Sequence, residues 1–295
     1  MEAFFIAHGS SIIVSAFSAG IVVALKDIYE WFKKTDFVRK QSIRSEMQLE
    51  VTLINYLKDG KGYFSPNKNL EDSLMDLFET ALCEGGLYVF GSPSHTGKSV
   101  YLQEYLNAFR RKRKDKTYIA VVTFSDEEIN MKSFQALLKI PFGRKLSDFL
   151  PKGSLIVIDQ FNLQHLSEGL KLFFTELATA SFNSKDFGVI VSVSSPAVYD
   201  DILKCNYGQK IFPACDPKLL QYNEDMMFQF AKEVQPNWHI DKITDAVESC
   251  KKYRSVGVLR QVLLSKRNVL NNKIEVKWND FEKHYDSFVD ASRDE

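Results

Sequence analysis

The chain has 295 residues, and its 38 Lys and Arg residues are balanced by 38 Asp and Glu residues, so the formal net charge is zero. That balance gives no indication of an anionic partner. Hydrophobic residues make up 45% of the chain, as in an ordinary globular protein with one large domain or two modest ones. The widely spaced cysteines argue against a disulfide framework and a cysteine-based zinc site, and they suit a reducing compartment. They are Cys83, Cys205, Cys215 and Cys250.

The first segment of the chain is uncharged from Ala3 to Leu25. Its length fits the roughly 20 apolar residues of a membrane-spanning helix, although polar residues such as His8 and Ser15 dilute it. A secretory signal peptide would need a basic start, whereas this chain has Glu2 there. A buried globular helix would not need so long an uncharged run. We predict a transmembrane anchor over residues 1–26 and keep both alternatives open.

Basic residues follow this segment and predict its orientation, because positive charge stays on the cytoplasmic side of a membrane. They are Lys26, Lys33, Lys34, Arg39, Lys40 and Arg44. The rest of the chain would therefore face the cytoplasm or an equivalent interior such as an organelle matrix. Ala16, Gly20 and Ala24 share one helix face. Small residues in this pattern let two membrane helices approach closely, or they reflect chance in an Ala- and Ser-rich segment.

Residues 27–64 are predicted to form a helical linker, because apolar residues recur at spacings of three and four. Glycine and proline then interrupt the pattern between Asp59 and Lys68. A second helix is predicted over residues 70–83, with Asn69 as its N-cap and Asp72 as a weak capping partner.

A glycine-containing loop follows the apolar run Gly86–Phe90, which is typical of a buried strand. A helical pattern begins directly after the Lys-Ser pair of this loop. Strand, loop, Lys-Ser and helix in this order are typical of a phosphate-binding loop, which uses backbone N–H groups to bind phosphates. The candidate nucleotide-binding residues are Gly91, Ser92, Pro93, Ser94, His95, Thr96, Gly97, Lys98, Ser99 and Val100.

Within this loop, Lys98 is expected to contact the β- and γ-phosphates of ATP, and the Ser99 hydroxyl to ligate Mg²⁺. The usual spacing is Gly-x-x-x-x-Gly-Lys-Ser/Thr, and counting back from Gly97 reaches Ser92, with Gly91 one position earlier. Either Ser92 replaces the first glycine or the loop is one residue longer.

A second motif lies in the run Ser154–Asp159, where four apolar residues are followed by an aspartate. An acid at the end of a buried strand is typical of Walker B, in which the carboxylate holds Mg²⁺ through water. Ser99 and Asp159 are therefore the predicted metal-binding residues.

Further strands are predicted on both sides of this run, and helical patterns separate most of them. They are Thr117–Phe124, Gly188–Ser194 and Gln209–Pro213, with a helix at 165–182. Alternating strands and helices indicate an α/β fold with a five-stranded parallel sheet between helices. Its ligand is expected at the carboxyl ends of the strands.

Together these motifs resemble the P-loop ATPases with an additional strand, which include the AAA+ and STAND families. The resemblance covers roughly residues 65–290 and implies a P-loop NTPase domain at 65–216 and a C-terminal helical lid at 217–295. The helical patterns in the lid lie at about 223–235, 240–253, 257–267 and 278–289. It also implies a sensor 1 residue, Ser194 or Ser192, with Ser194 nearer the strand end. Gly257-Val-Leu-Arg260 resembles the sensor 2 motif, so Arg260 would reach toward the γ-phosphate, although it equally suits a surface arginine.

The catalytic base has more than one candidate, because Gln160 stands where these ATPases have a glutamate after the Walker B aspartate. Glutamine orients water but does not accept a full proton. Glu127 and Glu128 follow the neighbouring strand, where some related ATPases place their catalytic glutamate. These acids also suit a helix N-terminus. The candidate catalytic residues are Asp159, Gln160, Glu127, Glu128, Ser194 and Arg260.

The basic run Arg110–Lys114 suits nucleic acid, anionic lipid or a solvated helix end. An arginine finger acting on a neighbouring subunit could be Arg110, Arg111, Arg113 or Arg144. The sequence therefore predicts a membrane-anchored ATPase that binds ATP and Mg²⁺, forms homo-oligomers and acts on a protein client. The alternatives are a non-hydrolysing nucleotide switch or scaffold and a nucleic-acid motor of a mobile element.

Overall fold

The computed structural model describes most of the chain from Asn67 onward. The described residues are 67–113, 118–123, 130–138, 140, 145–161, 163–205, 211–264 and 276–293. The predicted membrane anchor at 1–26 and linker at 27–64 lie outside these ranges. Of the helices within them, none has both the length and the hydropathy needed to cross a bilayer.

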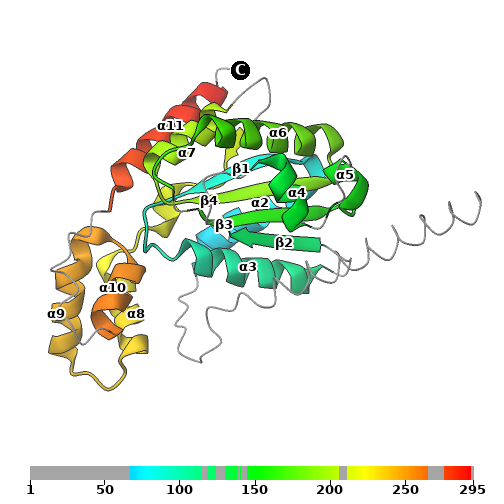
Figure 1. The fold of residues 1–295 in the computed structure, drawn as a ribbon. Helices are drawn as coiled ribbons and strands as arrows, with labels where there is room; N and C mark the ends of the chain where they lie inside the picture. The colour runs from blue at the N-terminus through cyan, green and yellow to red at the C-terminus, as the bar shows by residue number, and fades with distance from the viewer. Residues whose placement is uncertain are drawn as a thin grey trace, which may run out of the picture. The chain divides into compact units, whose positions relative to one another are not determined.

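Five parallel strands form one sheet in the order β2-β3-β4-β1-β5, which confirms the predicted sheet (Figure 1). The strands are β1 (Gly86–Gly91), β2 (Tyr118–Thr123), β3 (Ser154–Phe161), β4 (Phe187–Val193) and β5 (Ile211–Pro213). Every residue of β1 and β4 is buried, as expected of central parallel strands covered on both faces. Strands β1 and β3 both pair with β4 and run parallel to it, so their carboxyl ends lie at the same edge of the sheet. The loop after β1 and the Asp159 carboxylate of β3 are therefore both at that edge.

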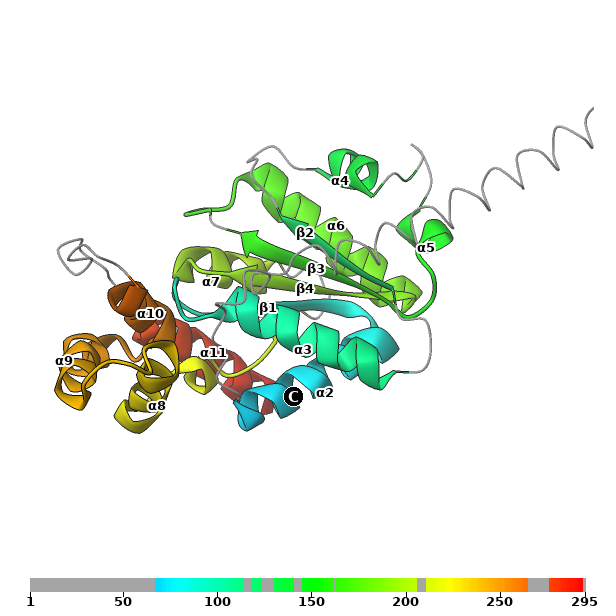
Figure 2. The ribbon, with the colours of Figure 1, turned by 90° about the horizontal axis from the view of Figure 1, so that it is seen from below.

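Helices cover both faces of the sheet (Figures 1 and 2). One face carries α2 (Lys68–Glu84) and α3 (Lys98–Lys112), and the other carries α6 (Glu168–Ser184) and α7 (Pro196–Lys204). The short helices α4 (Met131–Leu137) and α5 (Leu146–Phe149) pack against α6.

The N-cap of α2 is Asn67, so the predicted cap at Asn69 is wrong. The Asn67 side chain accepts a hydrogen bond from the Leu70 amide at 3.1 Å and donates one to the Leu219 carbonyl at 2.7 Å. The second bond joins the start of α2 to a residue far along the chain, and a local capping pattern does not contain that information.

Strand β3 continues to Phe161, beyond the predicted end at Asp159. Between Ile158 and Phe161, β3 has one residue more than the opposing segment of β4, which pairs through Val191 and Val193. This is a β-bulge, a feature that redirects side chains and is common beside active sites. The bulge lies at Asp159 and Gln160, so both predicted catalytic positions on β3 are at an irregular point of the strand.

The lid consists of three helices that pack on one another (Figure 2). They are α8 (Glu224–Val234), α9 (Ile240–Cys250) and α10 (Val256–Leu264). The predicted lid also included the last helix, α11 (Trp278–Arg293), but α11 packs against α7 and the 3-10 helix η1 (Pro217–Leu220). The Phe281 ring lies 5.5 Å from the Tyr199 ring of α7. This buried aromatic contact assigns α11 to the sheet domain.

Candidate nucleotide-binding site

The loop between β1 and α3 is closed at its base by its own side chains. Thr96 Oγ1 donates to the Pro93 carbonyl at 3.0 Å and accepts from the Ser92 hydroxyl at 2.7 Å. Ser92 and Thr96 are both fully buried. Gly97 then adopts a left-handed conformation with φ 93°, which glycine takes at little cost. These features produce a six-residue turn, Ser92–Gly97, that leads directly into α3.

The structure resolves the irregular glycine spacing. Gly91 is the last residue of β1, and a Cβ atom added there would lie 2.4 Å from the Tyr199 ring. Gly91 therefore serves the close packing of α7 on the sheet. The six residues from Ser92 to Gly97 match the usual loop, with Ser92 in the place of the first glycine and its hydroxyl bonded to Thr96.

Lys98 is the first residue of α3, and only 6% of it is exposed. Its Nζ donates to the Ser92 carbonyl at 2.6 Å and to the Pro93 carbonyl at 3.0 Å. Burial lowers the pKa of the Lys98 ammonium from 10.5 to about 7, and the charge of Asp159 opposes that shift. A cation held only by neutral carbonyls in a buried site is expected to bind an anion strongly.

Ser99 and Asp159 form the second part of the site. The Ser99 hydroxyl donates to Asp159 Oδ1 at 3.0 Å, and Asp159 is only 4% exposed. Asp159 pairs with Thr123, which is the last residue of β2. The Asp159 carboxylate therefore lies at the carboxyl end of the sheet. A hydroxyl and a carboxylate are the hard oxygen donors that Mg²⁺ prefers. This pair therefore fits the predicted Mg²⁺ site.

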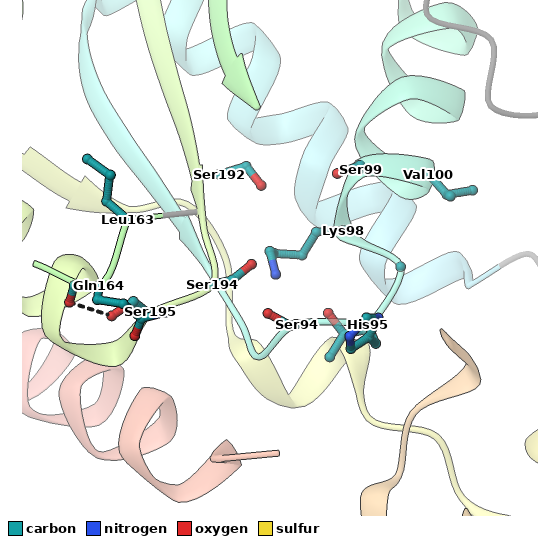
Figure 3. Close-up of a pocket in the computed structure, with 12 residues that line it drawn as sticks. Ser94, His95, Lys98, Ser99, Val100, Leu163, Gln164, Ser192, Ser194 and Ser195 are labelled. Atoms are coloured by element: carbon teal, nitrogen blue, oxygen red, sulfur yellow. Dashed lines mark hydrogen bonds between the residues drawn. The ribbon is translucent and has the colours of Figure 1, made fainter. Parts of the chain in front are cut away.

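A cavity of about 470 Å³ adjoins the loop (Figure 3). It is lined by Ser94, His95, Thr96, Gly97, Lys98, Ser99, Val100, Leu163, Gln164, Ser192, Ser194 and Ser195. The side chains of Lys98 and Ser194 point toward one another in Figure 3. Both predicted sensor 1 candidates, Ser192 and Ser194, thus lie at the cavity.

Three further residues line the cavity that were not predicted from the sequence: Leu163, Gln164 and Ser195. Ser195 is the N-cap of α7, and its hydroxyl donates to the Gln164 carbonyl at 3.1 Å and accepts from the Val198 amide at 3.4 Å. The Ser195-Pro196 pair is a sequence signal for a helix start, and it could have located α7. We find no sequence signal for Leu163 and Gln164, because tertiary packing brings them to the cavity.

Several predicted site residues do not line the cavity. Gly91, Ser92 and Pro93 are buried at the base of the loop, and Arg260 is exposed on α10. Glu127 and Glu128 lie outside the described residues, as does the side chain of Gln160.

The basic run at the end of α3 is partly neutralised by α2. Lys112 pairs with Glu71 at 3.3 Å, and Arg113 pairs with Glu79 at 2.6 Å. The described part of this run, Arg110–Arg113, lies at the opposite end of α3 from the loop, about 20 Å away at 1.5 Å per helical residue. Among the other arginine-finger candidates, Arg144 lies outside the described residues.

Comparisons with known proteins gave no matching family model and no matching curated protein. Solved structures of AAA+ P-loop NTPases do resemble the chain. The Walker-type ATPase PABY2304 of Pyrococcus abyssi is 15% identical, with a TM-score of 0.46 over 78% of this chain and 72% of that one. Domain III of the Thermotoga maritima replication initiator DnaA is 9% identical, with a TM-score of 0.46 over 78% and 95%.

AMPPCP-bound DnaA from Aquifex aeolicus is 13% identical, with a TM-score of 0.43 over 78% of this chain and 68% of that one. Similarities at this level do not bear on what this chain binds or does. Its own geometry is more informative: the strand order, the loop from Ser92 to Gly97 and the carboxylate of Asp159 fit a P-loop α/β fold.

Proposed function

We propose that this protein binds ATP with Mg²⁺ in the cavity beside the loop and acts as a membrane-anchored AAA+/STAND-like ATPase. ATP binding and hydrolysis would be coupled to conformational change or assembly. The observation that carries the proposal is that the buried Lys98 cation and the Ser99 hydroxyl, which donates to the Asp159 carboxylate, both lie at one cavity.

Each part of this site has a role in binding the triphosphate. Backbone N–H groups at the start of α3 attract phosphate oxygens, and the helix dipole reinforces them. Lys98 would exchange its bonds to the Ser92 and Pro93 carbonyls for bonds to phosphate oxygens. The Lys98 ammonium would then have negatively charged hydrogen-bond acceptors in place of neutral ones. Ser99 and Asp159 would hold Mg²⁺, which neutralises phosphate charge when it is bound.

The rate of hydrolysis depends on which residue activates the attacking water, since Gln160 follows Asp159. If the attacking water is oriented by Gln160 alone, hydrolysis is slow; if Glu127 or Glu128 accepts the proton, it is faster. The second candidate function is a non-hydrolysing switch or scaffold, in which bound ATP stabilises an interaction surface. Gln160 is the observation that favours it.

Two measurements on the full chain separate these functions. Calorimetry with ATP and Mg²⁺ measures binding, and a phosphate-release assay measures turnover. If the protein is an ATPase, we expect the wild type to bind ATP and to release phosphate. Asp159→Asn should still bind ATP but should release no phosphate. Binding without phosphate release would favour the switch, and no binding at all would overturn both.

Gln160→Glu and the pair Glu127→Gln and Glu128→Gln then locate the base. Gln160→Glu should raise turnover if the water lies beside β3, whereas loss in either Glu→Gln variant would place the base after β2. If all three variants release phosphate at the wild-type rate, none of these residues is the base.

The proposed anchoring and assembly rest on sequence features. Residues 1–26 would anchor the protein with the remainder facing the cytoplasm or an organelle matrix, and copies would associate as homo-oligomers that act on a protein client. Flotation with phosphatidylcholine vesicles tests the first point, because removal of residues 1–26 should abolish co-flotation. Co-purification of two differently tagged copies, with and without ATP, tests the second.

A further inference from the structure

The tip of the phosphate loop is bonded to the lid. Ser255 Oγ donates to the His95 carbonyl at 2.6 Å, and Gln261 Nε2 lies 2.9 Å from His95 Nδ1. The amide donates to the ring when that nitrogen carries no proton. Both contacts join residues at least 160 positions apart in the sequence. His95 is therefore held by two lid residues: Gln261, which lies in α10, and Ser255, which directly precedes α10.

Gly257 brings the backbone of α10 directly against the same carbonyl. A Cβ atom added at Gly257 would lie 1.7 Å from the His95 oxygen and 2.5 Å from its carbonyl carbon. These are backbone atoms, so no rotation of a side chain could relieve the overlap. Close contact with the loop thus explains the glycine of the Gly257–Arg260 segment, without any contact between Arg260 and the cavity.

His95 needs support from its surroundings, because it has a left-handed backbone with φ 65°. This conformation is uncommon for residues other than glycine and persists where neighbouring groups hold it. Ser255 supplies a rigid partner: it is fully buried, and its hydroxyl also accepts from the Val258 amide at 3.3 Å as the N-cap of α10. The lid thereby holds the loop in its strained conformation.

The His95 carbonyl also sets the direction of an amide in the loop. A trans peptide is planar, so its C=O and N–H bonds point in opposite directions. With the His95 carbonyl directed at the lid, the Thr96 N–H points away from the lid, and Thr96 lines the cavity. No described residue of α8, α9 or α10 lines the cavity itself, so the lid acts on the site through the loop.

We propose that Ser255, Gly257 and Gln261 are positioning residues of the phosphate site: the docked lid holds His95, and with it the loop tip, in the conformation that binds phosphate. Affinity for the triphosphate then depends on the lid. This inference rests on the proposed ATP binding. It attributes the effect of the lid on ATP affinity to the backbone of the loop.

Calorimetry of ATP and Mg²⁺ with the full chain tests the proposal. Ser255→Ala and Gln261→Ala should each weaken binding about fivefold, the value of one ordinary hydrogen bond. Gly257→Ala should weaken it more, because α10 must move off the loop. If Gly257→Ala does not fold, the two polar truncations decide the question. Wild-type affinity in both truncated variants would overturn the proposal.

Two control variants in the lid match these changes without contacting the loop. Asn223→Ala removes the N-cap of α8, whose side chain accepts from the Met226 amide at 2.8 Å, as Ser255→Ala removes that of α10. Gln235→Ala removes a glutamine that bonds the Leu263 carbonyl at 2.9 Å. Both should bind ATP as the wild type does. Equal weakening in the controls would mean that lid stability, and not loop contact, determines affinity, which contradicts the proposal.

A double variant shows whether Gln261 acts through His95. In the His95→Gly background the ring is absent, so adding Gln261→Ala should cause no further loss of ATP affinity. Fully additive losses would overturn this assignment.

Hydrogen exchange without nucleotide separates this inference from the proposed function. Amides of residues 94–97 should exchange faster in Ser255→Ala and Gln261→Ala than in the wild type and the two controls. Unchanged exchange refutes the positioning role even if ATP binds. Faster exchange in a protein that does not bind ATP would leave the lid contact established and overturn the proposed function alone.

Discussion

The base of the phosphate loop is held by bonds within the loop, whereas its tip is held by the lid. At the base, Thr96 bonds to Ser92 and Pro93, and Lys98 donates to the carbonyls of the same two residues, all across at most six positions of sequence. At the tip, His95 bonds to Gln261 of α10 and to Ser255, which caps that helix. The base is thus a local structure that forms with β1 and α3, and the tip depends on how the lid packs. Changes at the base should therefore have larger effects than changes at the tip.

The largest effect is expected at Lys98. Lys98→Ala should weaken ATP binding at least about 100-fold, because it removes the buried cation that faces the phosphates. Calorimetry measures the loss, and Lys171→Ala, which removes an exposed lysine paired with Glu168, is the matched control. ATP affinity that survives in Lys98→Ala would show that the nucleotide does not bind this loop.

Removal of the Thr96 hydroxyl tests whether the base is self-contained. Thr96→Val leaves the buried Ser92 hydroxyl and Pro93 carbonyl without this partner, so the free energy of unfolding should fall by about 2 kcal/mol. Urea denaturation measures the change. Thr244→Val, at an exposed lid residue that bonds the Ile240 carbonyl, should cost much less. A similar loss in both variants would contradict the difference between base and lid.

The lowered pKa of Lys98 predicts a pH dependence of ATP affinity. With a pKa of about 7 in the free protein, Lys98 is charged below pH 7 and loses its proton above it, while bound phosphate favours the charged form. Affinity should be greatest below pH 7 and should fall about tenfold between pH 6 and pH 8.

The control for this prediction is Lys98→Arg, which stays charged throughout the range. Its pH profile reports only the titration of the nucleotide and of other groups. Identical profiles for wild type and Lys98→Arg would show that Lys98 does not titrate near pH 7.

The smallest effect is expected at the tip. His95→Asn keeps a residue that tolerates the left-handed backbone and retains the carbonyl bond to Ser255, and it loses only the contact with Gln261. ATP affinity should fall about fivefold, as in Gln261→Ala, because the same hydrogen bond is lost. A loss as large as that of Lys98→Ala would mean that the His95 ring itself binds phosphate.

Much of the fold was predictable because its signals are local. Apolar runs predicted the five strands, and the Lys98-Ser99 pair after a glycine located the loop within the strand-loop-helix unit. The ends of elements were less predictable. The bulge at Asp159 and Gln160 arises from pairing with β4, and the cap at Asn67 is stabilised by Leu219. Likewise, a helical period predicted α11, but only its contact with Tyr199 places it on the sheet domain.

The sequence alone determined the chemistry at the centre of the site: a lysine and a serine in the loop after one strand, and an aspartate near the end of another. Tertiary structure decided which glycine serves which purpose. Gly91 accommodates Tyr199, and Gly257 accommodates the loop backbone. Both roles depend on atoms that are distant in sequence and approach only when α7 packs on the sheet and α10 packs on the loop. Close packing leaves no space for a Cβ atom at these points, and no pattern of neighbouring residues contains that information.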